Sequence, residues 1–539
     1  MKRFSVVYTW RPSRIGVSEG LNVLLADLVK GLGVLGIPVR IYTTSRHKGG
    51  LEAMLQANQV PQTAFEIVPI IEGSLSLDWY YGRASRPRRR SRLLMRLSRF
   101  MRRILKPRSM LRSLSWMLDL SRSNIALKIW PLFLVIILTL PVVVVLLPGL
   151  AVMAAAALGG RWIGRKLRAA VSNVRGRTSK RLINALDRAT SGRNKQISIN
   201  TVFTYLSESV YRQECERLAR ALQNVEDDTL FFPAAFDGHL IANLKSKKTV
   251  VVFPDAVTAV FPTRYPANDF MSLLIWNVKR SVTAASGLIC YSEFSKSEQL
   301  MRLLSGDNRD RKITVIPQGF YVDAAAEPIS SEELNSYVRN YLPDLGDLPR
   351  MNFGHFEYLI YPTVDRPHKN SLTLIKAGEV LIRKHFLDIK IVLTSPGATP
   401  DVIDYIRDKK LHRDVIFMPS LPIKVLNTML EGAAVTVHPS LAEGGDIFNF
   451  SRAVSNGTPA LLSNIPVARE MFDRNGITKQ TYESWLFDPF DADTLAGKIA
   501  DILASRSAWV AQQKAVLGQL SSYRFEDMAR RYYEFYCKV

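Results

Sequence analysis

The sequence predicts the α/β class, with two doubly wound parallel-sheet domains and a membrane-associating helical insertion in the first of them. Three observations support this. Short apolar runs alternate with amphipathic helical patterns towards both ends of the chain. At 539 residues the chain exceeds what one hydrophobic core comfortably serves. A long central segment differs from both ends in charge and hydropathy.

The excess positive charge lies within residues 83–195. The whole chain has 72 lysines and arginines against 48 acidic residues, a formal net charge of +24. Residues 83–195 hold 26 of the basic residues and two acidic ones, Asp119 and Asp187, so the rest of the chain is neutral overall. Such a segment suits an anionic membrane surface or nucleic acid.

The same segment contains a long apolar run. Residues 129–160 carry no charge, and a span needs ~20 apolar residues for a ~30 Å hydrocarbon core. A basic amphipathic helix over residues 92–106 would lie on an anionic bilayer surface. Because both flanks are basic and the strands on either side should share one sheet, we expect a re-entrant hairpin over 129–160. Its turn would lie at Pro141 or Pro148, and both of its ends in the cytoplasm.

Two alternatives stand beside the hairpin. The apolar run could be a buried core helix or an oligomer interface. A nucleic-acid arm fits less well, because the basic residues flank an apolar run and do not alternate with aromatic residues. The start of the chain has no small-residue cleavage site, and Cys215, Cys290 and Cys537 are widely spaced. We therefore expect the protein at the cytoplasmic face of the inner cell membrane.

A βαβ pattern opens the chain and resumes after the insertion. Residues 4–8, 38–44 and 65–71 have strand patterns, and residues 19–35 have a helical pattern. Beyond the insertion we expect helices over 202–222 and 270–286 and strands over 228–232, 249–253, 287–291 and 313–316. We assign residues 1–82 and 196–325 to this domain and residues 83–195 to the insertion.

The second domain begins after a connection rich in Pro, Gly and Asp, residues 326–350. Strands and helices then alternate through residues 351–518, which predicts a second parallel sheet. The expected strands are 358–362, 388–394, 414–418, 433–437 and 460–463, and the expected helices between them are 371–384, 399–410 and 423–432.

The stretch from His438 to Pro459 organises this second domain. It follows the strand 433–437, turns at two glycines and continues into a helix over 448–456. In open α/β sheets ligands bind beyond the carboxyl ends of the strands, and a helix N-terminus suits a phosphate. Glu443 therefore lies where a nucleotide would bind, although a generic strand-turn-helix unit could have the same pattern.

Pro439-Ser-Leu-Ala-Glu443-Gly, followed by Gly457-Thr-Pro459, resembles the donor-site signature of glycosyltransferase family 4. Asp365-Arg366-Pro-His368-Lys369-Asn370 resembles the basic pair and Asn with which that family binds the donor diphosphate. The resemblance covers roughly residues 1–50 and 200–539. It implies a GT-B fold, in which two Rossmann-like domains face a cleft and the carboxyl-terminal helix, within 519–539, packs back on the first domain.

The resemblance also implies roles for particular residues. Glu443 and Lys369 would be catalytic, with Glu443 near the donor sugar and Lys369 on the diphosphate leaving group. The residues expected to bind the donor are Arg366, His368, Asn370, Gly444, Gly445, Phe448, Ser451 and Arg452. The family's second carboxylate is missing: spacing from Glu443 gives Ser451, and counting back from Gly457 gives Arg452.

The first domain also departs from the family pattern. Where the family has a Gly pair, this chain has only Gly16, followed by Val17 and Ser18, and the expected His-Asp pair after the strand 249–253 is reduced to Asp255. His239 follows another strand, although a lone His is more often structural. The candidate acceptor-site residues are Gly16, Ser18, Asp255 and His239.

The predicted function is transfer of a sugar, with retention of configuration, from a nucleotide-sugar to a lipid-linked glycan or glycolipid in surface polysaccharide synthesis. A soluble acceptor would give no reason for an apolar hairpin in the domain that binds the acceptor. The expected partners are the nucleotide-sugar, the lipid-linked acceptor and an anionic membrane, without nucleic acid, metal or cofactor. The alternative is a degenerate transferase that acts as a membrane-anchored scaffold.

Overall fold

The computed structural model describes residues 2–9, 20–74, 77, 199–265, 269–304, 311–320, 329–341, 352–364, 366–419 and 421–539. The chain divides into two compact units, one of residues 1–71 and 216–539 and one of residues 72–215. The first unit contains two parallel β-sheets, each the centre of one α/β domain. The predicted insertion, residues 83–195, and its hairpin over 129–160 lie outside the described residues.

Within the described ranges, no helix has both the length and the apolar character needed to span a bilayer. The apolar run at 129–160 is not among the helices searched. Its membrane topology therefore stays a prediction.

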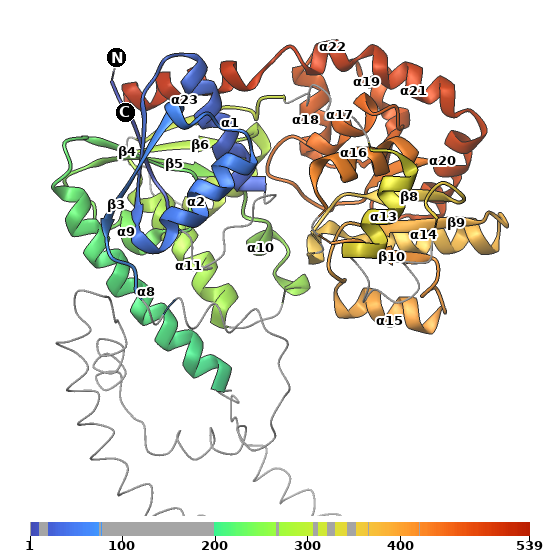
Figure 1. Cartoon of the computed structure of the whole chain (residues 1–539), viewed down its shortest axis with the longest axis horizontal. Helices are drawn as coiled ribbons and strands as arrows, with labels where there is room; N and C mark the ends of the chain where they lie inside the picture. Colours follow the sequence, from blue (N-terminus) through green and yellow to red (C-terminus); the bar gives the residue numbers. More distant parts are fainter. Residues whose placement is uncertain are drawn as a thin grey trace, which may run out of the picture. The chain divides into compact units, whose positions relative to one another are not determined.

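The amino-terminal domain is built on a seven-stranded parallel sheet with the order β3-β2-β1-β4-β5-β6-β7 (Figure 1). Its strands are β1 (Phe4–Val7), β2 (Val39–Thr44), β3 (Phe65–Ile71), β4 (Thr229–Phe232), β5 (Lys248–Phe253), β6 (Gly287–Cys290) and β7 (Lys312–Val315). The strand order reverses direction between β1 and β4, which is where open α/β sheets bind ligands.

The predicted elements of this domain are confirmed to within a few residues. All residues of β1, β4 and β6 are buried, and these strands are mostly apolar in the sequence. The helices are α1 (Gly20–Val34), α2 (Ser45–Ala57), η1 (Gln62–Ala64), α8 (Ile199–Gln223), α9 (Gly238–Ile241), α10 (Val257–Val260), η2 (Pro262–Arg264), α11 (Asp269–Ala284), η3 (Ser295–Leu300) and α12 (Met301–Leu304).

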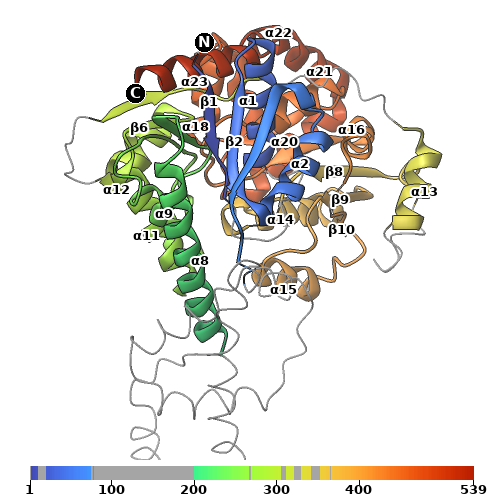
Figure 2. The same cartoon turned by 60° about the vertical axis from the view of Figure 1, so that its left-hand side comes forward.

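The last helix of the chain, α23 (Phe525–Lys538), packs on the amino-terminal domain. Tyr532 and Tyr536 share a hydrophobic cluster with Phe4 and Phe231 of the sheet. The Tyr533 hydroxyl donates to the Lys2 carbonyl at 2.9 Å, so the two ends of the chain lie side by side (Figures 1 and 2).

The carboxyl-terminal domain is built on a six-stranded parallel sheet with the order β10-β9-β8-β11-β12-β13. Its strands are β8 (Glu357–Tyr361), β9 (Ile389–Leu393), β10 (Val415–Phe417), β11 (Val435–His438), β12 (Ala460–Ser463) and β13 (Leu486–Phe487). The direction reverses between β8 and β11. Two Rossmann-like parallel-sheet domains are therefore confirmed.

Helices cover both faces of this sheet, and each face has its own hydrophobic cluster. They are η5 (Pro367–Lys369), α14 (Ser371–Arg383), α15 (Pro400–Asp408), α16 (Ile423–Gly432), α17 (Phe448–Ser455), α18 (Pro466–Arg474), α19 (Lys479–Tyr482), η6 (Glu483–Trp485), α20 (Ala492–Ala504), α21 (Arg506–Ala515) and α22 (Leu517–Leu520). The connection 326–350 contains a helix that the sequence analysis did not expect, α13 (Ser331–Tyr341).

Candidate functional site

Two loops of the carboxyl-terminal domain meet where its sheet reverses direction. One loop, residues 366–370, follows β8, and the other, residues 439–445, follows the neighbouring strand β11. The Asn370 side-chain amide donates to the Pro439 carbonyl at 3.0 Å and to the Pro489 carbonyl at 2.8 Å. The Leu441 amide donates to the His368 carbonyl at 2.8 Å. These bonds hold the two loops together.

Lys369 and Glu443 form an ion pair between these loops. The Lys369 Nζ atom lies 2.6 Å from Glu443 Oε1, and each side chain keeps 22% of its surface exposed. Burial opposes the ionisation of Glu443, but the charge of Lys369 and the hydrogen bond from Lys369 lower its pKa to about 2. Burial likewise opposes the charge on Lys369, yet Glu443 raises the pKa of the ammonium above its ordinary value. Both groups are therefore charged at neutral pH.

His368 lies beside this pair but carries no charge itself. Its side chain is buried, and the Tyr265 hydroxyl of the amino-terminal domain is hydrogen-bonded to its Nδ1 atom. Burial and the neighbouring Lys369 charge lower its pKa to about 3. His368 therefore cannot supply the positive charge of the arginine that the family has at this position. Arg366 is exposed and charged, and its charge acts on Lys369.

The two glycines after Glu443 lie against the amino-terminal domain. The Ser295 hydroxyl donates to the Gly444 carbonyl at 2.6 Å, and the Ser292 hydroxyl lies 2.9 Å from the same oxygen. A Cβ atom on Gly444 would lie 2.0 Å from the Pro254 carbonyl oxygen, and one on Gly445 would lie 2.7 Å from the Tyr291 Cβ atom. Only glycine fits at either position.

Asp255 is the predicted acceptor-side residue that the structure brings to the Glu443 loop. A Cβ atom on Gly444 would lie 3.0 Å from the Asp255 Cβ atom. Burial and the Glu443 charge raise the pKa of this carboxyl group above its ordinary value, although the Val257 amide donates to it at 3.1 Å. His239 lies elsewhere, with its buried ring 4.9 Å from that of Trp276. Gly16 and Ser18 are outside the described residues.

Three predicted donor residues belong to α17. Ser451 is buried, and its hydroxyl donates to the Phe448 carbonyl at 3.0 Å, so its hydrogen atom is used within the helix. The side chains of Phe448 and Arg452 are partly exposed. Of the two positions where the family's second carboxylate could fall, Arg452 therefore has the more accessible side chain.

The sequence analysis missed a second carboxylate that follows the glycines directly. The Asp446 side chain is 2% exposed, and Arg474 Nη2 lies 2.8 Å and 2.6 Å from its two oxygens. Burial raises the pKa of Asp446, and the Arg474 charge opposes that rise. The available signal was an acidic residue at the start of a helix, where a negative charge is favoured. This pair anchors the glycine turn to α18.

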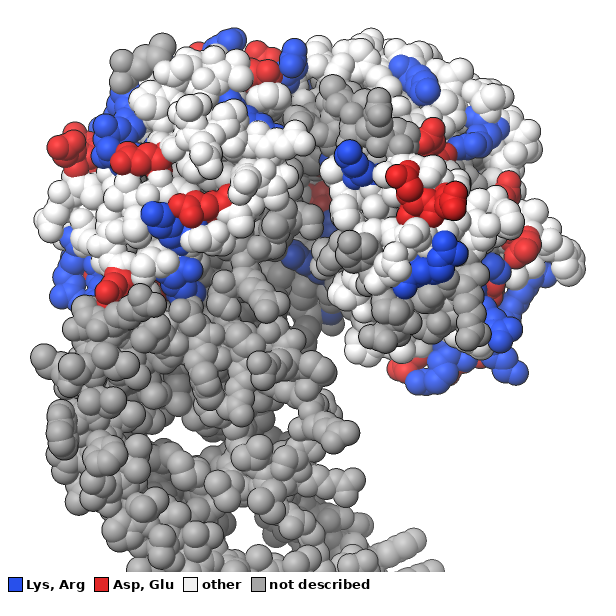
Figure 3. Space-filling view, in the orientation of Figure 1, with Lys and Arg blue, Asp and Glu red and all other residues white. Residues whose placement is uncertain are grey.

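On the face shown in Figure 3, Lys and Arg are interspersed with Asp and Glu over both domains. Among the described residues, no group of three or more His, Cys, Asp or Glu could hold a metal ion. The expectation of a reaction without metal or cofactor stays a prediction.

Residues 352–516 match the family model described as glycosyl transferases group 1. The match spans the carboxyl-terminal sheet and both loops that carry Lys369 and Glu443. It confirms the prediction that the chain is a glycosyltransferase.

Three of the solved structures to which this chain is similar are described by their identity, coverage and TM-score. An E. coli structure described as trehalose-6-phosphate bound with UDP-2-fluoro glucose is 14% identical, with 62% of this chain and 79% of that chain covered and a TM-score of 0.43. A UDP-forming trehalose-phosphate synthase from Burkholderia xenovorans is 14% identical, with 65% and 80% covered and a TM-score of 0.44. A sucrose-phosphate synthase from Thermosynechococcus elongatus is 16% identical, with 61% and 79% covered and a TM-score of 0.43. No curated protein matches the chain.

Proposed function

We propose that this glycosyltransferase has a family 4, GT-B architecture and transfers a sugar, with retention of configuration, from a nucleotide-sugar to a lipid-linked glycan or glycolipid. The observation that carries the proposal is the Lys369–Glu443 ion pair at the point where the carboxyl-terminal sheet reverses direction. The protein would act at the cytoplasmic face of the inner cell membrane, in surface polysaccharide synthesis.

The charge of Lys369 suits a diphosphate leaving group. An ammonium has three N–H donors, and Glu443 takes one of them, which leaves two for phosphate oxygens. The diphosphate gains negative charge as the glycosidic bond breaks, so a fixed cation stabilises the transition state more than the bound donor. The exposed Arg366 guanidinium provides a second cation, because His368 is neutral.

Glu443 and Asp255 would face the sugar and the acceptor. Glu443 is ionised and can accept hydrogen bonds from sugar hydroxyl groups, which orients the anomeric carbon towards the cleft. Asp255 comes from the amino-terminal domain, which binds the acceptor in this fold. Its raised pKa makes this carboxylate a better hydrogen-bond acceptor for the attacking hydroxyl group than an ordinary aspartate.

The lipid-borne acceptor follows from composition. Residues 83–195 combine 26 basic residues with the uncharged run at 129–160, all inserted in the domain that would bind the acceptor. Each Lys or Arg near an anionic surface contributes roughly 1 kcal/mol of attraction. A membrane-bound transferase domain would hold its cleft close to lipid headgroups.

Deletion of residues 83–195 tests the acceptor, with a short Gly/Ser bridge in their place. The shortened protein should bind its nucleotide-sugar with nearly the affinity of the full chain, because the donor contacts lie in residues 366–370 and 439–452. Transfer of radiolabelled sugar to membrane lipid extract should be lost. Full transfer by the shortened protein would refute the lipid acceptor.

The second candidate is a degenerate transferase that serves as a membrane-anchored scaffold. The scaffold is favoured because neither of the two positions that could hold the family's second carboxylate has one: position 451 is Ser and position 452 is Arg. If Arg452 contacts the nucleotide where the family has a carboxylate, Arg452→Glu should change the preference among nucleotide bases in a turnover assay. Unaltered kinetics would show that Arg452 has no such role, and donor binding without any turnover would favour the scaffold.

A further inference from the structure

A short segment of the amino-terminal domain, residues 292–295, contacts the carboxyl-terminal domain beside the candidate catalytic glutamate. The Ser292 and Ser295 side chains are both buried. The Ser295 hydroxyl donates to the Gly444 carbonyl at 2.6 Å. The Ser292 hydroxyl lies 2.9 Å from both that carbonyl and the Ser295 Oγ atom, and its single hydrogen can go to either. The residue that receives these bonds follows Glu443 directly.

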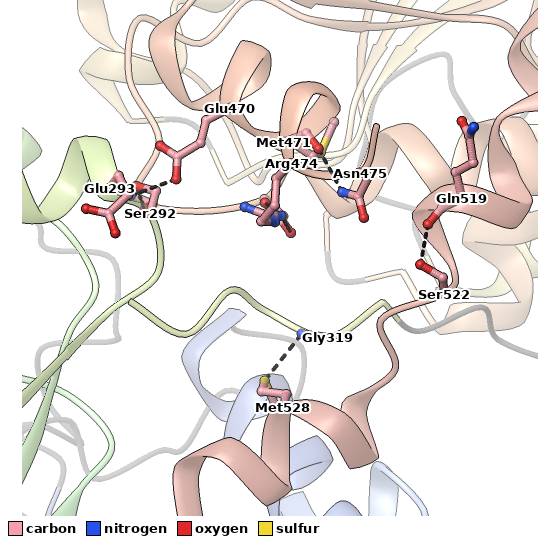
Figure 4. Close-up of polar contacts among 12 residues, drawn as sticks. Ser292, Glu293, Gly319, Glu470, Met471, Arg474, Asn475, Gln519, Ser522 and Met528 are labelled. Atoms are coloured by element: carbon pink, nitrogen blue, oxygen red, sulfur yellow. Dashed lines mark hydrogen bonds and ion pairs between the residues drawn. The ribbon is translucent and has the colours of Figure 1, made fainter. Parts of the chain in front are cut away.

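The same segment is held a second time by Glu470 of α18. One Glu470 oxygen accepts from the Glu293 amide at 2.7 Å (Figure 4). The other accepts from the Phe294 amide at 3.1 Å. Both amides belong to the first turn of the helix that Ser292 caps, where N–H groups lack intrahelical partners. A carboxylate is also favoured at that end by the helix dipole.

The fit around Gly444 leaves little freedom for the Glu443 loop while this contact exists. A Cβ atom at Gly444 would fall 2.0 Å from the Pro254 carbonyl oxygen. The Gly444 backbone therefore packs directly against the Pro254 backbone. Lys369 and Asn370, in contrast, contact Glu443, Pro439 and Pro489 of the carboxyl-terminal domain. Separation of the two domains would therefore free the Gly444 carbonyl and the His368 ring, which is bonded to Tyr265, but leave Lys369 and Asn370 bonded.

We propose that Ser292, Ser295 and Glu470 are positioning residues: they fix the Glu443–Gly444 turn in its catalytic geometry only when the two domains are in contact. This inference rests on the proposed transferase function and deepens it. Donor binding and bond cleavage become separate steps, because the contacts of Lys369 and Asn370 lie on one domain while the orientation of Glu443 depends on the other. The defect on loss of the contact should then fall on kcat and leave the donor KM unchanged.

The first test replaces both hydroxyl groups, in Ser292→Ala/Ser295→Ala. Since even a 1 Å misplacement of a catalytic group can cost on the order of 100-fold, kcat should fall at least about tenfold, with the donor KM within about twofold of the wild type. Ser297→Ala is the matched control, because its hydroxyl donates to the Glu293 carbonyl of its own helix at 2.9 Å. The control should keep both constants.

The second test alters Glu470, which accepts hydrogen bonds from the amides of Glu293 and Phe294. Glu470→Gln keeps the size of the side chain but loses its charge and one of two acceptor oxygens, so its kcat should also fall while the donor KM holds. Glu298→Gln, on η3 of the amino-terminal domain, is the control, because the Glu298 side chain is 46% exposed and pairs with Arg302 four residues further along the chain. A kcat within twofold of the wild type in both the double serine variant and Glu470→Gln would overturn the proposal.

A distance measurement separates this inference from the function on which it rests. Glu52 of α2 and Asp401 of α15 are exposed, and Cys537 is an exposed native cysteine. Spin labels attached to Glu52→Cys and Asp401→Cys, in a protein that also carries Cys537→Ser, report the distance between the two domains. The distribution should be broader in Ser292→Ala/Ser295→Ala than in Ser297→Ala, and an unchanged distribution would overturn the inference. If the wild type turned over no donor, the transferase proposal would fail, while the distances would still test the interdomain contact.

Discussion

At the scale of single residues, the Lys369–Glu443 pair is the centre of the candidate site. Glu443→Gln keeps the shape of the side chain and removes its charge, while Lys369→Ala removes the cation that we propose faces the leaving group. We expect kcat to fall by roughly 100-fold or more in each variant, because each charge acts on the breaking bond. The donor KM should also rise in Lys369→Ala. Steady-state kinetics of nucleotide release measures both constants.

A second ion pair of the same domain provides the control. Lys390 Nζ lies 2.9 Å from Asp414 Oδ1, with side-chain exposures of 19% and 21%, close to those of the candidate pair. Lys390→Ala should therefore change kcat by less than about twofold, because it removes a comparable pair away from the site. Equal losses in Lys369→Ala and Lys390→Ala would mean that Lys369 matters for folding alone.

His438 predicts a particular dependence of stability on pH. Its ring is buried edge-on against Tyr361, its Nε2 atom has no hydrogen-bond partner among the described residues, and burial lowers its pKa to about 3. The unfolded chain, with an ordinary His pKa near 6.5, binds more protons between these values. The contribution of neutral His438 to the free energy of unfolding is therefore fully present above about pH 6.5 and is lost as the pH falls towards 3.

His438→Phe tests this dependence, because it keeps an aromatic ring without a titrating group. Its free energy of unfolding, measured in urea, should fall less between pH 7 and pH 4 than that of the wild type. At pH 7 the variant should be at least as stable if the ring fits, because an unpaired buried polar atom costs about 1–3 kcal/mol. Parallel pH curves for the two proteins would contradict the assignment.

The sequence predicted which residues meet at the site better than it predicted whether those residues are charged or neutral. The two loops and the Lys369–Glu443 pair follow from residue order after strands, because parallel strands end at one edge of a sheet. The neutrality of His368 could not be predicted, since it depends on burial against Tyr265, more than 100 residues away in the chain. The Asp446–Arg474 pair was missed because the sequence does not show which basic residue the Asp446 carboxylate contacts.

At the scale of elements, the glycine turn between β11 and α17 is the most constrained connection. Gly444→Ala places a methyl group 2.0 Å from the Pro254 carbonyl oxygen, so either the turn or the interdomain contact must shift. We expect kcat to fall by about 100-fold, as for other small misplacements of catalytic groups. Kinetics together with a thermal unfolding curve separates this effect from loss of folding.

Gly497 of α20 is the control for this substitution. A Cβ atom there would meet nothing within 4 Å. Gly497→Ala should leave kcat unchanged and raise stability by up to ~1 kcal/mol, because Ala is the better helix former. If Gly444→Ala behaved in the same way, the tight packing between Gly444 and Pro254 would be wrong.

Long elements were predictable and short or connecting ones were not. The strand 460–463 is confirmed at both ends, because a buried parallel strand is a nearly unbroken apolar run. The strand 65–71 is also confirmed at both ends, although its residues are partly exposed. β13 has only two residues, too few for a periodic signal. α13 did carry a signal, since Ser330 and Glu333 form a capping box, but the neighbouring prolines favoured a loop.

At the scale of the whole molecule, α23 joins the end of the chain to its beginning. The Tyr536 hydroxyl donates to the Thr229 carbonyl at 2.5 Å and accepts from the Ser5 amide at 3.3 Å, both in buried surroundings. Tyr536→Phe should therefore cost about 1–3 kcal/mol of unfolding free energy, measured in urea. Tyr533→Phe, whose hydroxyl bonds to the Lys2 carbonyl nearer the solvent, should cost less than about 0.5 kcal/mol. Equal costs would show that the Tyr536 bonds add nothing.

The uneven charge of the chain also belongs to this scale. A neutral pair of α/β domains carries one inserted segment that holds the entire net charge. Sequence composition alone predicts attraction to an anionic membrane, because that attraction depends on the number of charges more than on their geometry. The sugar and the nucleotide base depend on side-chain geometry around a bound donor and did not follow from the sequence.

Nucleotide release is the most direct test of the central claim that Lys369 and Glu443 serve transfer from a nucleotide-sugar. Purified protein and its Glu443→Gln variant would be incubated with a panel of nucleotide-sugars and membrane lipid extract. We expect release of nucleotide from at least one donor, dependent on the extract, and a loss of roughly 100-fold or more in the variant. Binding of a donor without turnover, or equal turnover by the two proteins, would contradict the account.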